Sequence, residues 1–127
     1  MKRVFLLSLF FTLMSVVSVI AQDRFRIDKV LKEISPKQAE AYNPLFVSTY
    51  SYTINGQLVS KRYFVAAQSP QHNSSARVVQ SESSTQPWLL EINGRSVYID
   101  FDNDSGLRTG DEGVIQYYGD QLYFILD

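Results

Sequence analysis

Two Asn-Gly dipeptides, Asn55-Gly56 and Asn93-Gly94, each lie at the centre of a run in which apolar and polar residues alternate. Asn-Gly tolerates the positive φ that both central positions of a type I′ turn require, so each dipeptide predicts a tight antiparallel hairpin. Gly119-Asp120, with the glycine first, predicts a further hairpin with a type II′ turn. A chain that reverses repeatedly at two-residue turns is built from neighbouring antiparallel strands, which indicates a mainly β fold.

The two-residue turns also predict which residues face each other. The predicted apolar pairs are Leu90 with Val97 and Trp88 with Ile99 about Asn93-Gly94, and Tyr117 with Leu122 and Ile115 with Phe124 about Gly119-Asp120. About Asn55-Gly56 the same register pairs Tyr50 with Lys61, and we predict that the aromatic face of this hairpin belongs to the core.

A helical pattern precedes the first hairpin. Four apolar residues recur at the spacing of one helix face and predict an amphipathic helix over residues 23–34. They are Ile27, Val30, Leu31 and Ile34. Ser35-Pro36-Lys37-Gln38 then combines an N-cap serine, a proline at the first helical position and the glutamine of a capping box. A second short helix is therefore predicted to about Tyr42, so that residues 22–44 form a helical segment before the β domain.

Residues 45–127 are predicted to form the β domain, and a segment rich in serine and glutamine interrupts it at residues 68–87. Few of its residues are apolar, so we predict a mobile loop with a short strand at Ala76 to Gln80. A loop of this length inside a compact domain is either functional or disordered.

The N-terminus has the pattern of a secretory signal peptide over residues 1–21. Lys2 and Arg3 precede an uncharged apolar run from Val4 to Ile20, and cleavage is predicted after Ala21. The alternative is that residues 4–20 stay as a membrane anchor. The sequence has no cysteine, which excludes disulfides and any thiol chemistry. Because of the predicted signal peptide, we expect a secreted or periplasmic protein.

The charge balance gives no sign of a nucleic-acid partner. Loss of Lys2 and Arg3 with the signal peptide leaves ten basic residues against thirteen acidic ones. A polyanion would need a basic face, and the mixture of basic and aromatic residues from Lys61 to Phe64 is interpreted as an ordinary strand surface. The expected partner is a protein, a peptide or an envelope polymer, and a membrane only if residues 4–20 are retained. The oligomeric state is not predicted.

No catalytic machinery is visible. His72 is the only histidine, and it lies in the serine-rich segment without a neighbouring acidic partner. A histidine base needs such a partner and a positioned nucleophile. We therefore predict that the protein is not an enzyme. The alternative from that class is a hydrolase whose carboxylates come together from distant strands.

An acidic stretch offers a second alternative, a domain stabilised by calcium. Asp100, Asp102 and Asp104 resemble the opening of an EF-hand loop, with Asp111 at the last ligand position. Ser105 stands where that loop needs glycine, and an aspartate replaces the final glutamate. On a strand, the same aspartates would simply form the wet face. No cofactor is expected otherwise.

Tyrosines supply the predicted binding residues. All eight tyrosines follow the signal peptide, and Tyr98, Tyr118 and Tyr123 fall on the strand faces opposite the predicted core. Tyrosine on an exposed sheet can stack on sugars or bind peptides. Its ordinary role as a strand former is the alternative.

The closing segment carries a pattern of leucine, two residues, Gly-Asp-x-Gly, three residues, an aromatic residue, one residue and glycine. Its members here are Leu107, Gly110, Asp111, Gly113, Tyr117 and Gly119. The pattern resembles the C-terminal signature of an uncharacterised family of small bacterial domains, exported or membrane-anchored, of unknown function. The resemblance implies a small antiparallel β-barrel and an exported position, but no activity. The segment between the hairpins is longer here than in that family, and the predicted helices have no counterpart in it.

These patterns together predict a small antiparallel barrel or bent meander of about six strands, OB-like or SH3-like, preceded by one or two short helices. The predicted function is an exported, non-enzymatic binding or structural module of the bacterial envelope.

Overall fold

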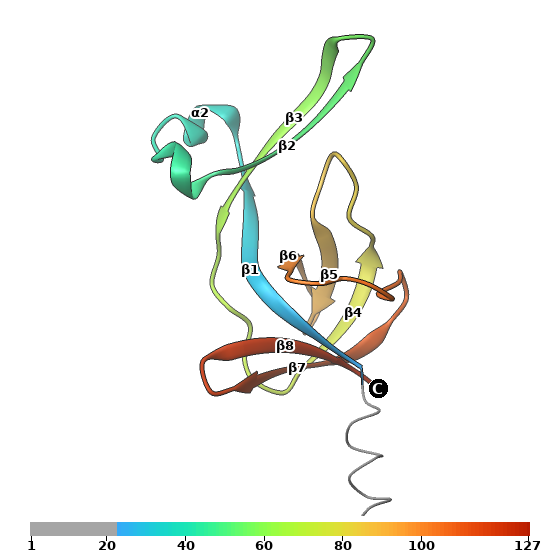
Figure 1. Cartoon of the computed structure of the whole chain (residues 1–127). Helices are drawn as coiled ribbons and strands as arrows, with labels where there is room; N and C mark the ends of the chain where they lie inside the picture. Colours follow the sequence, from blue (N-terminus) through green and yellow to red (C-terminus); the bar gives the residue numbers. More distant parts are fainter. Residues whose placement is uncertain (1–22) are drawn as a thin grey trace, which may run out of the picture.

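The computed structural model describes residues 23–127 (Figure 1). The predicted signal peptide and the alternative anchor lie outside the described residues. The elements in chain order are β1 Arg24–Ile34, α2 Pro36–Ala39, η1 Pro44–Phe46, β2 Ser48–Ile54, β3 Gln57–Ala66, β4 Ser74–Gln80, β5 Trp88–Ile92, β6 Arg95–Phe101, β7 Glu112–Tyr118 and β8 Gln121–Leu126. No helix between residues 23 and 127 has the length and apolarity needed to cross a membrane.

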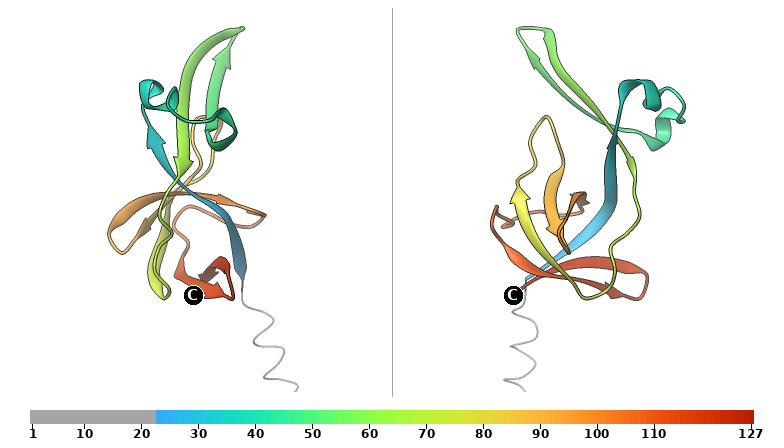
Figure 2. Two further views of the ribbon diagram at one scale, coloured as in Figure 1. Left: turned by 90° about the vertical axis from the view of Figure 1, so that its left-hand side faces the viewer. Right: turned by 180° about the vertical axis from the view of Figure 1, so that it is seen from behind.

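Six of the strands close into an antiparallel barrel, as predicted. Neighbours pair in the order β1-β6-β5-β4-β7-β8, and β8 pairs back with β1. The pairing of β1 with β8 joins Arg24 to Ile125 and Ile27 to Leu122. The remaining two strands, β2 and β3, form a hairpin attached to the far end of β1 and projecting beyond the barrel (Figures 1 and 2). Closure removes the free edges that an open sheet of these strands would have.

The prediction of a helix over residues 23–34 is wrong, because this segment is the strand β1. A register shift between Ile27 and Lys29 breaks the alternation, so the apolar residues of β1 follow an irregular spacing that imitates a helical one. Val30 enters the barrel core, whereas Leu31, also buried, takes the opposite face. A strand buried on both faces near a bulge has no clean period of two.

The capping box at Ser35 is confirmed. The Ser35 hydroxyl accepts a hydrogen bond from the Gln38 N–H at 3.1 Å, and the Gln38 side chain accepts one from the Ser35 N–H at 2.9 Å. The helix it begins, α2, ends after one turn at Ala39. Since α2 follows β1, the prediction that helices precede the barrel is wrong: this segment connects the first barrel strand to the hairpin.

The hairpin registers about Asn93-Gly94 and Gly119-Asp120 are confirmed. Trp88 pairs with Ile99, and Tyr117 with Leu122. Asn93 and Gly94 have φ of 50° and 80°, as a type I′ turn requires. The apolar pairs fill the barrel interior. The interior cluster consists of Phe25, Ile27, Val30, Ala76, Val78, Trp88, Leu90, Ile92, Ile99, Phe101, Leu107, Ile115, Leu122 and Phe124.

The serine-rich segment 68–87, predicted as a mobile loop with a short strand, contains a strand of the barrel. The short strand predicted at Ala76 to Gln80 is present and begins at Ser74. Ala76 and Val78 point into the core, and β4 pairs with β5 on one edge and β7 on the other. Alternation of small apolar residues with Ser75 and Arg77 is enough for a strand that faces water on one side.

The first hairpin forms about Asn55-Gly56, but its predicted register and its assignment to the core are wrong. The pairs next to the turn follow the two-residue loop, and a register shift after Tyr52 then pairs Tyr50 with Arg62 instead of Lys61. β2 is exposed along most of its length. The two faces of this hairpin differ in polarity, as in a core hairpin, yet only the base of the hairpin contacts the rest of the molecule.

The C-terminal pattern has a structural role at each of its central positions. Leu107 is buried in the core, and Gly110 bends the chain with a φ of 94°. Asp111 closes the turn, since its carboxylate accepts the Arg108 N–H at 2.8 Å. At Gly113 the β8 backbone passes so close that an added Cβ would collide with the Ile125 carbonyl oxygen.

We predict that Gly113→Ala destabilises the barrel by more than about 3 kcal/mol, because neither backbone can move without breaking the β7–β8 ladder. Gly106→Ala is the matched control: Gly106 has a φ of 85° but open space around it, so its cost is about 1 to 2 kcal/mol. Urea denaturation of both variants checks the order, and equal losses would contradict it.

Candidate functional site

The β2–β3 hairpin, residues 48–66, is called the arm below. The C-terminal part of β3 pairs with the end of β1, from Leu31 opposite Ala66 to Ile34 opposite Tyr63. β2 pairs only with β3, so within the described chain its other edge has no strand partner. In Figure 1 the arm rises at the end of the molecule opposite the C-terminus, and Figure 2 shows the same projection from two further sides.

Arg62 fixes the base of the arm to the barrel. Its Nε and Nη2 atoms each donate to Glu33 at 2.8 Å, which makes a two-pronged pair. Nη2 also donates to the Tyr98 hydroxyl at 2.9 Å, and Nη1 to Gln86 Oε1 at 3.1 Å. The guanidinium lowers the pKa of Glu33 below its usual range through these hydrogen bonds. One side chain therefore ties β3 to β1, β6 and the segment before β5.

Aromatic rings continue this attachment. Phe64 is fully buried and packs edge-on against Tyr98 at 5.0 Å and against Tyr50 at 5.4 Å between ring centres. The Arg62 guanidinium lies over Phe64 at 5.3 Å. Burial raises the pKa of the Tyr50 hydroxyl to about 12, and the Glu82 carboxylate adds to the rise. The base of the arm is thus a packed joint, and the arm leaves the barrel in one direction.

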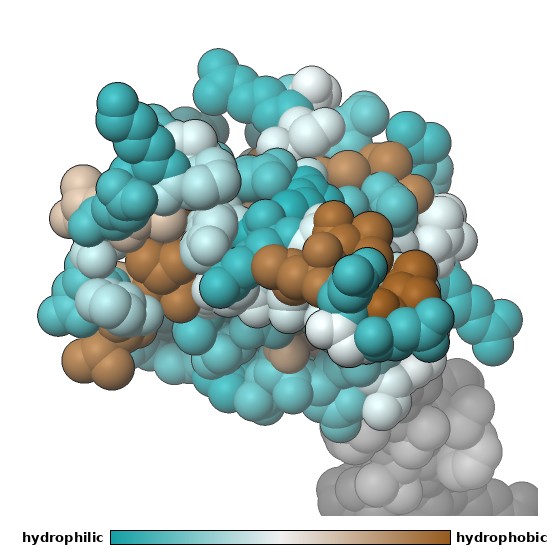
Figure 3. Space-filling model, turned by 90° about the horizontal axis from the view of Figure 1, so that it is seen from above, coloured by the Kyte–Doolittle hydropathy of each residue, from teal (hydrophilic) through white to brown (hydrophobic). Residues whose placement is uncertain are grey.

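Beyond this joint the arm exposes apolar side chains. Seven of the nine large apolar or tyrosine residues that are exposed in the described chain lie between residues 42 and 59. They form a shoulder group at one end of β2 and a tip group at the other, with Tyr52 between them. The shoulder group is Tyr42, Leu45 and Phe46, and the tip group is Ile54, Leu58 and Val59. Figure 3, which views this end of the molecule, shows apolar surface in several separate places among hydrophilic residues.

A groove of about 470 Å³ lies beside the shoulder group. Tyr42, Leu45 and Phe46 line one side, and the ends of β1 and β3, with Leu31 and Val65, line the other. Its walls are mostly apolar, apart from Lys29 and Ser48. A hollow of this kind accepts apolar side chains, which gain free energy when they leave water.

The strand β2 and the segments on both sides of it also lack charge. Between Glu40 and Lys61 no residue is ionisable apart from tyrosines, and β2 contains no proline or glycine. The register shift leaves β2 regular, because the extra residue is Val59 on β3. Exposed edge strands usually carry charges, prolines or bulges that prevent pairing with another chain. β2 has none of these protections.

The three predicted tyrosines do not form one surface. Tyr118 and Tyr123 are neighbours, with ring centres 5.5 Å apart, and Arg24 lies over Tyr118 at 5.3 Å. Tyr98 is half-buried in the joint of the arm, where its hydroxyl accepts from Arg62. Its side chain acts in the attachment of the arm, whereas Tyr118 remains exposed.

The predicted calcium ligands are Asp100, Asp102, Asp104 and Asp111, and each has a different environment. Asp102 pairs with Arg26 at 3.0 Å on the surface, Asp104 accepts from the Trp88 indole at 2.9 Å, and Asp111 closes the turn described above. No group of three or more histidine or acidic side chains in residues 23–127 could hold a metal ion. The four aspartates do not converge into a ligand set.

Asp100 lies near other acidic side chains. Burial raises the pKa of Asp100, and the nearby carboxylate of Asp28 raises it further, while Lys29 opposes the rise. Burial likewise raises the pKa of Glu82, with Asp100 adding to it. Such mutual repulsion between carboxylates is a cost to the folded state.

His72 is placed as a structural residue. Its Nδ1 atom accepts the Tyr117 backbone N–H at 3.1 Å, and the Tyr117 hydroxyl donates to the Pro70 carbonyl at 3.1 Å. These bonds fasten the segment before β4 to β7. An acceptor Nδ1 requires the neutral imidazole.

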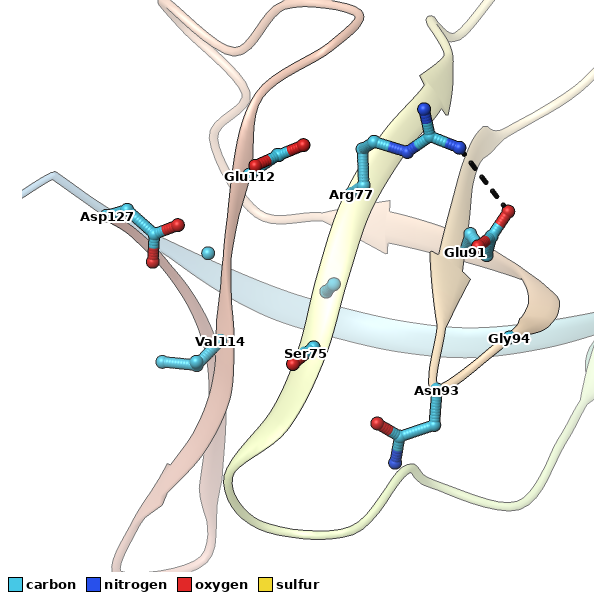
Figure 4. A pocket seen from close by; sticks show the side chains of 10 residues that line it. Ser75, Arg77, Glu91, Asn93, Gly94, Glu112, Val114 and Asp127 are labelled. Atoms are coloured by element: carbon cyan, nitrogen blue, oxygen red, sulfur yellow. Dashed lines mark hydrogen bonds and ion pairs between the residues drawn. The ribbon is translucent and has the colours of Figure 1, made fainter.

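A second hollow, of about 350 Å³, lies on the outer face of the barrel over β4 (Figure 4). Arg77 points across it toward Glu91 at 3.4 Å. In the register of the sheet Arg77 lies between Glu91 on β5 and Glu112 on β7. Its charge is therefore balanced within the sheet, and the surface is an ordinary solvated strand face.

Comparison of the chain with protein-family models, with curated proteins and with solved structures found no match. The resemblance of the C-terminal pattern to a family of exported domains stays a prediction.

The arm is the site that sequence reasoning missed. The Asn55-Gly56 hairpin was predicted, but its aromatic face was assigned to the core. The uncharged run from residue 41 to residue 60 was the available signal, because a core hairpin in a small barrel usually has charged residues on its wet face.

We predict that Arg62→Lys destabilises the protein by about 1 to 3 kcal/mol, since lysine cannot make the two-pronged bond to Glu33 or reach Tyr98 and Gln86 together. Arg77→Lys is the matched control and should change stability by less than about 0.5 kcal/mol, because its pair with Glu91 is exposed. Chemical denaturation measures both, and a larger loss for Arg77→Lys would contradict this assignment.

We also predict that Asp100→Asn raises the melting temperature at neutral pH. A carboxyl whose folded pKa is raised stabilises the fold only when protonated, and that contribution is lost as the pH rises through the folded pKa. The gain should therefore shrink as the pH falls to about 3, below the usual aspartate pKa. Asp102→Asn, which removes the exposed pair with Arg26, should give no gain. Melting curves at both pH values check this, and a lower melting temperature for Asp100→Asn at neutral pH would refute it.

Proposed function

We propose that the protein is an exported, non-enzymatic docking module that binds an extended polypeptide segment along the free edge of β2. The barrel is the rigid base, and the arm is the binding element. The single observation behind the proposal is that β2 combines an unpaired edge with exposed apolar flanks and a complete lack of charge. Strand addition is a common mode of peptide recognition because main-chain hydrogen bonds supply affinity and side-chain pockets supply specificity.

The chemistry of the site defines the segment it would accept. An added strand must be extended, free of proline and uncharged where it faces Tyr50, Tyr52 and Ile54, since a charge there would lose its hydration without a partner. The groove beside the shoulder group would receive one of its apolar side chains. Large polar polymers lack the alternating donors and acceptors that a strand edge binds.

The exported position rests on the predicted signal peptide over residues 1–21, with an anchor at residues 4–20 as the alternative. Either arrangement would place the folded domain outside the cytoplasm. The apolar arm would then meet other envelope polypeptides.

A labelled, end-capped peptide of alternating threonine and tyrosine tests the proposal. Its fluorescence anisotropy should rise on titration with the protein, with a Kd in roughly the micromolar range. The same peptide with a central proline should not bind, because proline removes a ladder donor and cannot extend the sheet.

Ser51→Lys should weaken peptide binding roughly tenfold or more, because a charge on the edge strand opposes strand addition. Ser51 is exposed, so the fold should persist. Ser96→Lys is the matched control, an exposed serine on the barrel strand β6 that is paired with Glu91 on β5. Equal affinity for the proline peptide, or no effect of Ser51→Lys, would refute the proposed site.

A further inference from the structure

We infer that the strand added to β2 is the β2 of a second copy of this chain, so that two molecules join through their arms. This inference rests on the proposed function and names the partner. The geometry points to an antiparallel pair about a two-fold axis at Ser51, which extends each arm into the sheet β3-β2-β2-β3 across the two copies. A two-fold interface uses the same surface on both molecules, and that surface must therefore complement itself.

The sequence of β2 is self-complementary in this register. Ser51 lies opposite Ser51 of the second copy, and Tyr50 lies opposite Tyr52 of the second copy. Thr49 then faces Thr53 of the second copy. Aromatic pairs and threonine pairs across an antiparallel ladder are each favourable, by roughly 0.2 to 1 kcal/mol. No position in the pairing opposes two charges, because β2 has none.

The two exposed apolar groups are placed as such a dimer requires. The shoulder group precedes β2 and the tip group follows it, so the two groups lie at opposite ends of one strand. Antiparallel pairing lays the tip of each arm against the shoulder of the other copy. Ile54 of the second copy comes opposite Ser48, which lines the apolar groove. One molecule alone leaves both groups in water, whereas the pair covers both at once.

The two Lys61 side chains of such a dimer are far enough apart to permit this contact. Lys61 on β3 is paired with Ser51, so the two Lys61 side chains of a dimer would be three strand spacings apart. At about 4.8 Å per spacing this is roughly 14 Å, which exceeds the Debye length of about 8 Å at physiological salt. Repulsion between them is therefore mostly screened.

A second copy fits better than an unrelated strand because the complementarity is reciprocal. An unrelated segment would cover only the edge of β2. In the pair of copies, the tip group of each molecule also covers the shoulder group of the other. The seven-residue length of β2 also lets the ladder run its whole length in the symmetric register.

Sedimentation velocity over a concentration series tests the inference. The protein should form a dimer, Ser51→Lys should shift the monomer–dimer equilibrium toward monomer by roughly tenfold or more, and Ser96→Lys should leave it unchanged. A dimer that Ser51→Lys does not weaken would use another surface and would overturn the inference.

Cross-linking tests the register independently. Because the chain has no cysteine, Ser51→Cys introduces a single thiol on the proposed axis, and mild oxidation should give a disulfide-linked dimer. Leu58→Cys is the control: Leu58 lies at the arm tip, far from its own counterpart in an antiparallel pair, and should not cross-link. Efficient linkage of Leu58→Cys, or none of Ser51→Cys, would overturn the two-fold register.

The outcomes also separate this inference from the proposed function. A protein that stays monomeric up to about 100 μM but still binds the threonine–tyrosine peptide at the β2 edge would be a docking module for other chains, and the dimer would be wrong. A protein that neither dimerises nor binds the peptide would refute both. Binding of the peptide should compete with dimerisation if both are correct, since the two use one edge.

Discussion

The pairing of β1 along both of its edges is the constraint on which the rest of the structure depends. One edge pairs with β6 along the middle of the strand, and the other pairs first with β8 and then with β3. The pairing with β8 closes the barrel, and the pairing with β3 holds the arm. Because one strand serves both, the direction of the arm is fixed by the same hydrogen-bonded ladder that forms the core.

This arrangement gives a small domain a rigid support for an exposed strand. An isolated hairpin is marginally stable in water, and here Arg62, Phe64 and Tyr98 fasten its base to the barrel wall. The outer half of the hairpin can then keep an open, uncharged edge without losing its shape. A free edge is ordinarily a liability. On a fixed arm it becomes a defined surface for one partner, which is the basis of the proposed docking and of the inferred dimer.

The local sequence predicted the turns correctly, but it predicted poorly which strands and side chains come into contact. The type I′ turns at Asn55 and Asn93 and the capping box at Ser35 were predicted correctly, because each depends on residues a few positions apart. The helix predicted over residues 23–34 failed because the burial of Leu31 is set by β3 and β6, which follow much later in the chain. The aspartates from Asp100 to Asp111 looked like one ligand set in sequence, yet in the described residues they do not form a group of three or more that could hold a metal ion. The arm was missed because its aromatic alternation is that of an ordinary core hairpin.

The sequence by itself determined where the chain reverses and which residues of the last two hairpins face the core. These features follow from the φ that a residue permits and from the two-residue period of a strand. Only the tertiary structure decided that β1 is a strand, that the strand in segment 68–87 lies in the barrel between β5 and β7, and that the first hairpin leaves the core. The physical reason is that burial and edge pairing depend on strands distant in sequence, whose arrangement no local pattern contains.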